Sequence, residues 1–199
     1  MSATDAINKL IASGANHDLL AIVKGFRNGA VYGAKIRFPH ALVMTFLFRR
    51  TNLKDMARSI LTLTYQHSRN LAFFVTIYKT LLLVQRKIKG FEHNADSFIA
   101  GIIGGYIVFG KNTAVNNQIV LYLFSRISVG LAKLAVKRKI ISKPQHSFPV
   151  FAALTWGIVM WLFRHDRDTL QPSLQSSMQY LYNDSDVFDS IGNWLLSNK

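Results

Sequence analysis

The chain has 199 residues, of which half are hydrophobic, with 24 Lys and Arg against 10 Asp and Glu and no cysteine. The length is typical of one domain, and the lack of cysteine excludes disulfides, thiolate metal sites and cysteine nucleophiles. A net charge of +14 often indicates nucleic-acid binding. Here the mean hydropathy is +0.18, and the apolar residues form long blocks between basic clusters. This pattern is typical of a membrane protein with basic loops, so we expect a lipid bilayer as partner and no nucleic acid.

Charge and hydropathy divide the chain into three segments. Residues 1–18 form a polar N-terminal segment, and residues 19–163 form a basic, apolar segment that we expect to be embedded in the membrane. Residues 164–199 contain five of the ten acidic residues and only three of the 24 basic ones. We therefore predict a polar, weakly acidic C-terminal tail after residue 163.

Five apolar blocks cover residues 19–48, 59–85, 97–110, 118–136 and 148–163. A helix needs about 20 residues to cross a bilayer, so 59–85 and 118–136 are long enough, 148–163 is marginal and 97–110 is short. Pro39 is expected to break or kink the first block, because proline removes a helical hydrogen bond. We predict an all-α fold, a polytopic membrane helix bundle with four to five embedded helices. The sequence leaves the number of spans and their orientation open.

Small residues recur at every fourth position within three of these blocks. They are Gly25, Gly29 and Gly33 in the first block, Ser97, Gly101 and Gly105 in the third, and Ala153 and Gly157 in the fifth. Residues at this spacing lie on one face of a helix, and small faces let helix backbones approach closely inside a membrane. We predict that they are helix-packing faces; a glycine-lined conduit is the alternative.

Basic side chains lie inside otherwise apolar blocks, at Lys24, Arg27, Arg69 and Arg126, and no acidic residue lies deep in any block to neutralise them. A charge in hydrocarbon is costly, so such residues normally face a bundle interior or a wet cavity. Three alternatives stay open: arginines that snorkel to lipid headgroups, a polar cavity that these four residues line, and hydrogen bonds between helices.

No pattern in the sequence indicates catalysis, a cofactor or a metal. The six histidines are scattered, with no pair three or four residues apart: His17, His40, His67, His93, His146 and His165. Without cysteine, and without a pair of acids inside an apolar block, neither a metal centre nor general acid–base chemistry is expected. We predict no cofactor and no enzymatic activity.

Two long runs, Lys24–Arg37 and Pro39–Arg49, together with residues 104–105, 108–110, 169–178 and 180–182, resemble the family of 24-kDa peroxisomal membrane proteins. That family is grouped with the channel subunits of the mitochondrial inner-membrane translocases and with plastid transporters. The resemblance implies a multi-pass peroxisomal membrane protein that the peroxin-19 receptor delivers after translation. Such receptors recognise spans next to basic clusters, for which there are two candidates. These are Arg86, Lys87 and Lys89, and Lys137, Arg138 and Lys139.

Two functions follow as expectations from these observations and the resemblance. The first is a non-enzymatic integral membrane protein with a structural or partner-binding role. The alternative is a pore or translocase-like conduit for small anionic solutes or polypeptide. In the tail, Leu174, Met178 and Leu181 share a helix face, which predicts packing on the bundle or at the membrane interface. The oligomeric state is left open, with an oligomer as one alternative.

Overall fold

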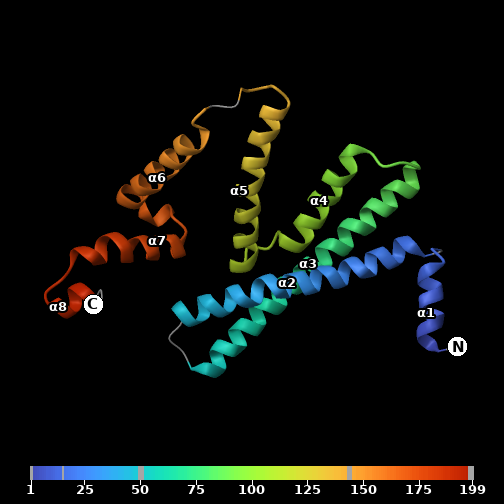
Figure 1. Cartoon of the computed structure of the whole chain (residues 1–199), viewed down its shortest axis with the longest axis horizontal. Helices are drawn as coiled ribbons and strands as arrows, with labels where there is room; N and C mark the ends of the chain where they lie inside the picture. Colours follow the sequence, from blue (N-terminus) through green and yellow to red (C-terminus); the bar gives the residue numbers. More distant parts are fainter. Residues whose placement is uncertain (1, 15, 49–51, 143–144, 197–199) are drawn as a thin grey trace. The chain divides into compact units, whose positions relative to one another are not determined.

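The computed structural model describes residues 2–14, 16–48, 52–142 and 145–196, and the regular structure within these residues is entirely helical (Figure 1). The α-helices are α1 (Ala3–Ala12), α2 (His17–Phe48), α3 (Leu53–Lys89), α4 (Asn94–Phe109), α5 (Ala114–Lys137), α6 (Ser147–His165), α7 (Pro172–Met178) and α8 (Ile191–Leu196). Short 3-10 and π turns cover 167–169 and 179–186. The predicted all-α class is confirmed, and the five apolar blocks fall in helices α2 to α6.

Several helices run past the apolar blocks that predicted them, because polar residues cap their ends. In α3, Asn52 accepts a hydrogen bond from the Asp55 backbone N–H at 2.8 Å. At the other end Gly90, with φ 80°, adopts the left-handed conformation that glycine allows at a helix terminus. The 37-residue helix therefore begins and ends in polar sequence that a hydropathy profile does not detect.

Of the two expected effects of Pro39, the break is wrong, because α2 continues through this residue to Phe48, and the kink stays a prediction. Proline inside a helix costs about 3 kcal/mol through the lost hydrogen bond and a steric clash. Ala41 and Thr45, which follow the proline, are both buried. Packing of this last part of α2 offsets the local cost, as tertiary contacts often override helix propensity.

The chain divides into two compact units, Met1–Gly130 and Leu131–Lys199. In the first unit α2 packs along α3, and α4 packs on the C-terminal half of α3 (Figure 1). These three helices contain most of the buried residues of this unit.

Glycines of α2 touch the backbone of α3. A Cβ added at Gly29 would lie 2.8 Å from the Cα of Ala72, and one added at Gly33 would lie 2.6 Å from the Cα of Ser68. At Gly25 an added Cβ would meet the side chains of α3 at 2.9 Å. Only glycine fits at such distances, so the first predicted ridge lies where the two helices approach most closely.

The face of α4 that packs on α3 is one residue out of register with the predicted ridge. Asp96, Ala100 and Gly104 are the buried residues of α4, and a Cβ at Gly104 would lie 3.2 Å from the Phe74 ring. Ser97 is exposed, and added Cβ atoms at Gly101 and Gly105 would meet nothing within 4 Å. In α6, Ala153 is also exposed and Gly157 has open space around it.

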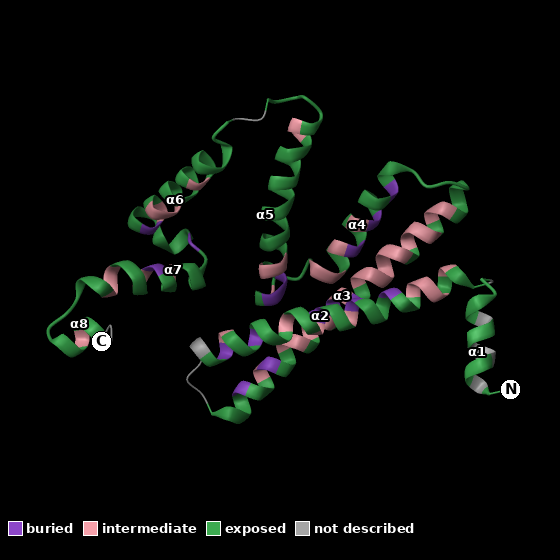
Figure 2. Ribbon diagram, viewed as in Figure 1, coloured by how far each residue is buried: buried purple, intermediate pink, exposed green. Residues whose placement is uncertain are grey.

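Two helices of the described part of the chain, α5 and α6, are long and apolar enough to cross a membrane. Their most apolar windows are 0% and 6% buried inside the protein, which the exposed colouring of both helices in Figure 2 also shows. The apolar helix α4 is shorter, and α2 and α3 do not meet the same test. The helices best suited to lipid are therefore those least covered by the chain itself.

The second unit has a small core where the tail folds back on α6. Phe163, Leu170 and Met178 are buried together, with Val159 and Leu162 packed against them. In the same unit the Arg167 guanidinium lies 5.7 Å from the centre of the Phe163 ring. Met178 thus packs as its position in the amphipathic pattern predicts, whereas Leu174 and Leu181 are exposed.

Candidate functional site

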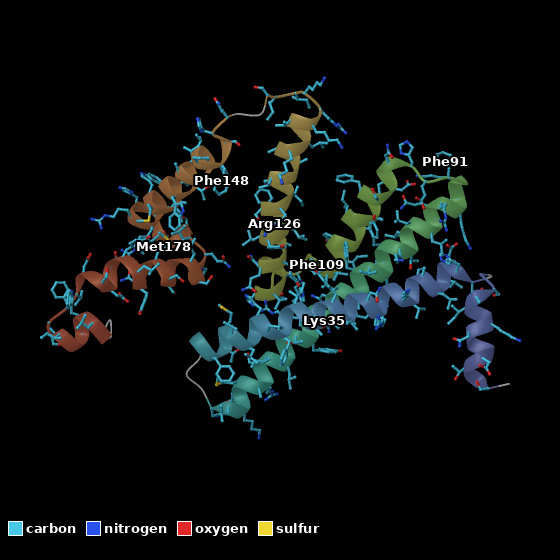
Figure 3. The ribbon with its side chains drawn as sticks, viewed as in Figure 1. Lys35, Phe91, Phe109, Arg126, Phe148 and Met178 are labelled. Carbon is cyan, nitrogen blue, oxygen red and sulfur yellow. The ribbon has the colours of Figure 1, made fainter. Side chains whose placement is uncertain are left out.

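The four basic residues that sequence patterns suggested as a polar cavity are Lys24, Arg27, Arg69 and Arg126, and all four are exposed. Arg27 donates to Asn28 at 3.0 Å, while Arg69 and Arg126 lie over tyrosine rings on their own helices. Figure 3 labels Arg126 on α5. Within the described residues no hydrogen bond or ion pair joins any two of the four, so the structure does not bring them together.

A different group of polar side chains gathers where α2, α3 and the first turns of α5 meet. We call this group the polar seam. It consists of Arg37 and His40 of α2, Thr64, His67, Ser68 and Asn70 of α3, and Asn116 and Gln118 of α5. His67, Asn70 and Asn116 are buried, and buried colouring also marks α2, α3 and the start of α5 in Figure 2.

The four-residue spacing of the packed positions of α2 places Arg37 in the polar seam. Gly33 lies against the α3 backbone at His67 and Ser68, and Arg37 follows Gly33 by four residues on the same face of the helix. Ala41, four residues later again, is also buried. A basic side chain therefore occupies one position in a row of small, packed residues.

Two hydrogen bonds tie α5 to the paired helices. Arg37 Nη1 donates to Gln118 Oε1 at 2.8 Å, and Asn70 Nδ2 donates to Asn116 Oδ1 at 2.9 Å. Asn116 Nδ2 in turn donates to the Lys111 carbonyl at 3.0 Å, in the turn between α4 and α5. These bonds fix the beginning of α5 on α2 and α3.

The seam also contains buried polar atoms without a protein partner. They are Arg37 Nε, Thr64 Oγ1, His67 Nδ1 and Ser68 Oγ. Leaving a buried donor or acceptor unpaired costs about 1–3 kcal/mol, so four such atoms in one place need an explanation. Among the described residues, no carboxylate lies within 4.0 Å of Arg37.

Ion pairs connect the C-terminal end of α3 to the beginnings of α2 and α4. Arg86 Nη2 donates to Asp18 Oδ1 at 2.8 Å, and Lys89 pairs with the buried Asp96. The hydrogen bond from Arg86 lowers the pKa of Asp18 below its ordinary value. The pKa of Asp96 is lowered by Lys89 and, to a smaller extent, by the backbone N–H of His93.

The two basic clusters proposed for targeting therefore differ in their surroundings. In the first, Arg86 and Lys89 are held in ion pairs, and Lys87 is exposed. In the second, residues 137–139 are all exposed at the end of α5. Lys139 adopts the left-handed conformation at φ 58°, where the chain turns out of the helix.

Across the described residues, no group of three or more His, Cys, Asp and Glu side chains is placed to hold a metal ion. Sequence reasoning missed the polar seam, since it did not include Arg37 among the candidate basic residues of the apolar blocks. Extending the spacing of Gly25, Gly29 and Gly33 by one more step reaches Arg37. That extension was the available signal.

Comparison with known proteins identifies the family. Residues 10–125, more than half of the chain, match the Tim17/Tim22/Tim23/Pmp24 family. The chain belongs to this family. It is 52% identical over 195 residues to Peroxisomal membrane protein 4 of Bos taurus, covering 98% of this chain and 92% of the relative. The human protein of the same name is 52% identical over 194 residues, which cover 97% of this chain and 92% of that relative. No solved structure matches the chain.

Membership of this family agrees with the helical fold and the two exposed apolar helices. The chain is a multi-pass helical protein of the peroxisomal membrane. The matched region, residues 10–125, includes α2, α3, α4 and about half of α5. The polar seam therefore lies wholly within the part of the chain that the family shares.

Proposed function

We propose that the protein is a non-enzymatic scaffold of the peroxisomal membrane. In this proposal α2, α3 and α4 form a rigid packed module, and the apolar faces of α5 and α6 are free for lipid and for partner proteins. The observation that carries the proposal is that no residue in the apolar window of α5 is buried. Its side chains Leu123, Phe124 and Ile127 are 47% to 65% exposed, and such a surface requires an apolar environment.

A second candidate, a conduit for small anionic solutes, is favoured by the polar seam. Arg37 is a half-buried cation without a carboxylate partner among the described residues, which is the type of group found along anion pathways. Arg69 and Arg126, in contrast, are exposed. A conduit would therefore depend on Arg37 and would tolerate replacement of either exposed arginine.

Conductance of the purified protein in a planar bilayer distinguishes the two candidates, provided that insertion is verified by protease mapping. The scaffold proposal predicts no conductance from correctly inserted protein. Anion-selective steps that disappear in Arg37→Gln and persist in Arg69→Gln and Arg126→Gln would replace it with the conduit. The two exposed arginines are matched controls because each variant loses the same single charge.

We further propose that the basic cluster after α5 is the signal for a targeting receptor of the peroxin-19 type. All three of its side chains are exposed, whereas two members of the cluster at the end of α3 are held in ion pairs. The triple variant Lys137→Gln, Arg138→Gln, Lys139→Gln should fail to reach peroxisomes in cells. The matched triple variant Arg86→Gln, Lys87→Gln, Lys89→Gln should still reach them; the opposite outcome would assign targeting to the first cluster.

A further inference from the structure

The polar seam contains a positive charge without a counterion, and buried hydrogen-bonding atoms without a partner, among the described residues. Arg37 donates through Nη1 to Gln118, and the same nitrogen lies 3.5 Å from His40 Nδ1. Its Nε has no partner, and no carboxylate of the described residues is close enough to neutralise the guanidinium. Buried cations are normally paired, so this charge lacks its expected counterion.

The register of α2 on α3 places the unpartnered atoms of α3 near this cation. Thr64 and Ser68 are one helical turn apart on the same side of α3, and His67 lies between them in sequence with only 8% of its surface exposed. Gly33, one turn before Arg37, is in backbone contact with α3 at residues 67 and 68. Because Arg37 follows Gly33 by one helical turn on the same face, this contact brings Arg37 toward the α3 side chains of the cluster.

The chemistry of these atoms selects an anion with several oxygens. Two hydroxyl groups, an imidazole nitrogen and the Nε–H of an arginine can all donate at once. Arginine binds phosphate oxygens with a planar fork of donors, and the bond is stronger because both partners are charged. A water molecule could accept hydrogen bonds from one or two of these donors, but it would leave the charge of Arg37 without a counterion.

We propose that the polar seam binds a phosphate group, held by Arg37 and by the hydroxyl groups of Thr64 and Ser68. The phosphate belongs either to a free anion or to a phospholipid headgroup, because the recognised chemistry is the same. It enters beside His40, which is the exposed member of the cluster, next to the half-buried Arg37. The inference does not rest on the scaffold role proposed above.

The test uses the full chain, purified in detergent and titrated with inorganic phosphate, with binding followed by broadening of the phosphorus NMR signal. Loss of a hydrogen bond to a charged group predicts binding about 10-fold to 100-fold weaker in Arg37→Gln. Ser68→Ala should weaken binding by a few-fold, since it removes one neutral donor from the site. This smaller change keeps the test decisive if Arg37→Gln does not fold, as circular dichroism would reveal.

Arg126→Gln is the matched control, because it removes one positive charge from an exposed position. It should bind phosphate like the unmodified chain, which separates the seam from general attraction to a chain of charge +14. In parallel, phospholipid retained by the purified protein is measured by mass spectrometry. Retained phospholipid that is lost in Arg37→Gln and kept in Arg126→Gln supports the headgroup as the source, whereas saturable binding of phosphate alone supports the free anion.

Two results would overturn the proposal. One is phosphate binding or lipid retention that is equal in Arg37→Gln and Arg126→Gln, which would place the anion elsewhere. The other is the absence of both saturable phosphate binding and Arg37-dependent lipid in folded protein. The unpartnered atoms of the seam would then be hydrated by water alone.

Discussion

The pair α2–α3 and the helix α5 differ in how far the chain covers their surfaces. The pair carries many charges, does not meet the hydropathy test for a span, and packs backbone against backbone over Gly29 and Gly33. Helix α5 meets the test easily, yet the chain covers none of its most apolar window. Hydropathy therefore identifies the helices that face outward, while the glycine spacing of α2 marks the face that packs on α3.

The largest effect is expected from a substitution that disrupts the packing of α2 on α3. Gly29→Leu places a side chain where even a Cβ would lie 2.8 Å from the Ala72 backbone, so α2 and α3 must separate. We expect a loss of about 3 kcal/mol in the free energy of unfolding, the upper range for overpacking. Gly101→Leu is the control, because a Cβ there meets nothing within 4 Å. Chemical unfolding in detergent measures both; equal losses would show that α2 and α3 do not pack through Gly29.

The next effect concerns the connection between the packed pair and α5. Asn70→Ala removes the donor of the buried hydrogen bond to Asn116 and leaves a buried acceptor unpaired. The expected loss is about 1–3 kcal/mol. A double-mutant cycle with Asn116→Ala in the same unfolding assay should give a coupling energy of about 1 kcal/mol. Strict additivity of the two single variants would contradict the bond.

A smaller effect is expected from acid at the turn between α3 and α4. The pKa of Asp96 lies below its ordinary value of 3.8, chiefly because Lys89 donates to it. A carboxyl group whose pKa is lowered on folding stabilises the protein above its unfolded pKa, and this stability is lost as the pH falls through the folded value. Asp96→Asn should therefore reduce Tm at about pH 6, and the two Tm values should converge as the pH falls through the folded pKa of Asp96. A Tm difference that stays constant with pH would contradict this assignment.

The smallest effect is expected at the exposed ion pair of Arg86 and Asp18, whose side chains are both 43% exposed. Such surface pairs contribute little to stability and are screened by salt. Arg86→Gln should thus lower Tm slightly at low ionic strength and not at about 1 M salt. Lys87→Gln loses the same charge without breaking an ion pair within 4.0 Å, so it should change Tm less. Equal changes in the two variants would assign the effect to net charge.

The sequence predicted the helices well because their apolar cores are long and distinct. All five blocks are helical, and the differences are at the ends, where polar caps such as Asn52 and His93 extend the helices beyond the apolar residues. Pro39 misled the prediction because a local rule was applied to a helix that tertiary packing stabilises. The ridge of α2 faces α3 as small-residue spacing suggests, but in α4 the packed face is set by Asp96 and its ion pair.

For the candidate site, the sequence indicated the type of residue involved but not which residue faces the packed helices. A role for unpaired basic residues in the apolar blocks stays a prediction, and which arginine turns inward depends on the register between two helices. Arg37 faces α3 because it continues the row of Gly25, Gly29 and Gly33, whereas Arg69 and Arg126 are exposed. The charge pattern alone does not predict which arginine faces inward, because that depends on the helix against which the arginine's own helix packs.

Photochemical labelling of the unmodified protein in a lipid bilayer tests the central comparison most directly. An apolar diazirine dissolved in the bilayer generates a carbene that reacts with side chains in contact with lipid, and mass spectrometry locates the products. The account predicts strong labelling of Leu123, Phe124 and Ile127 in α5 and none of Ala41 and Ala72 between α2 and α3. Labelling of the α2–α3 interface as strong as that of α5 would contradict it.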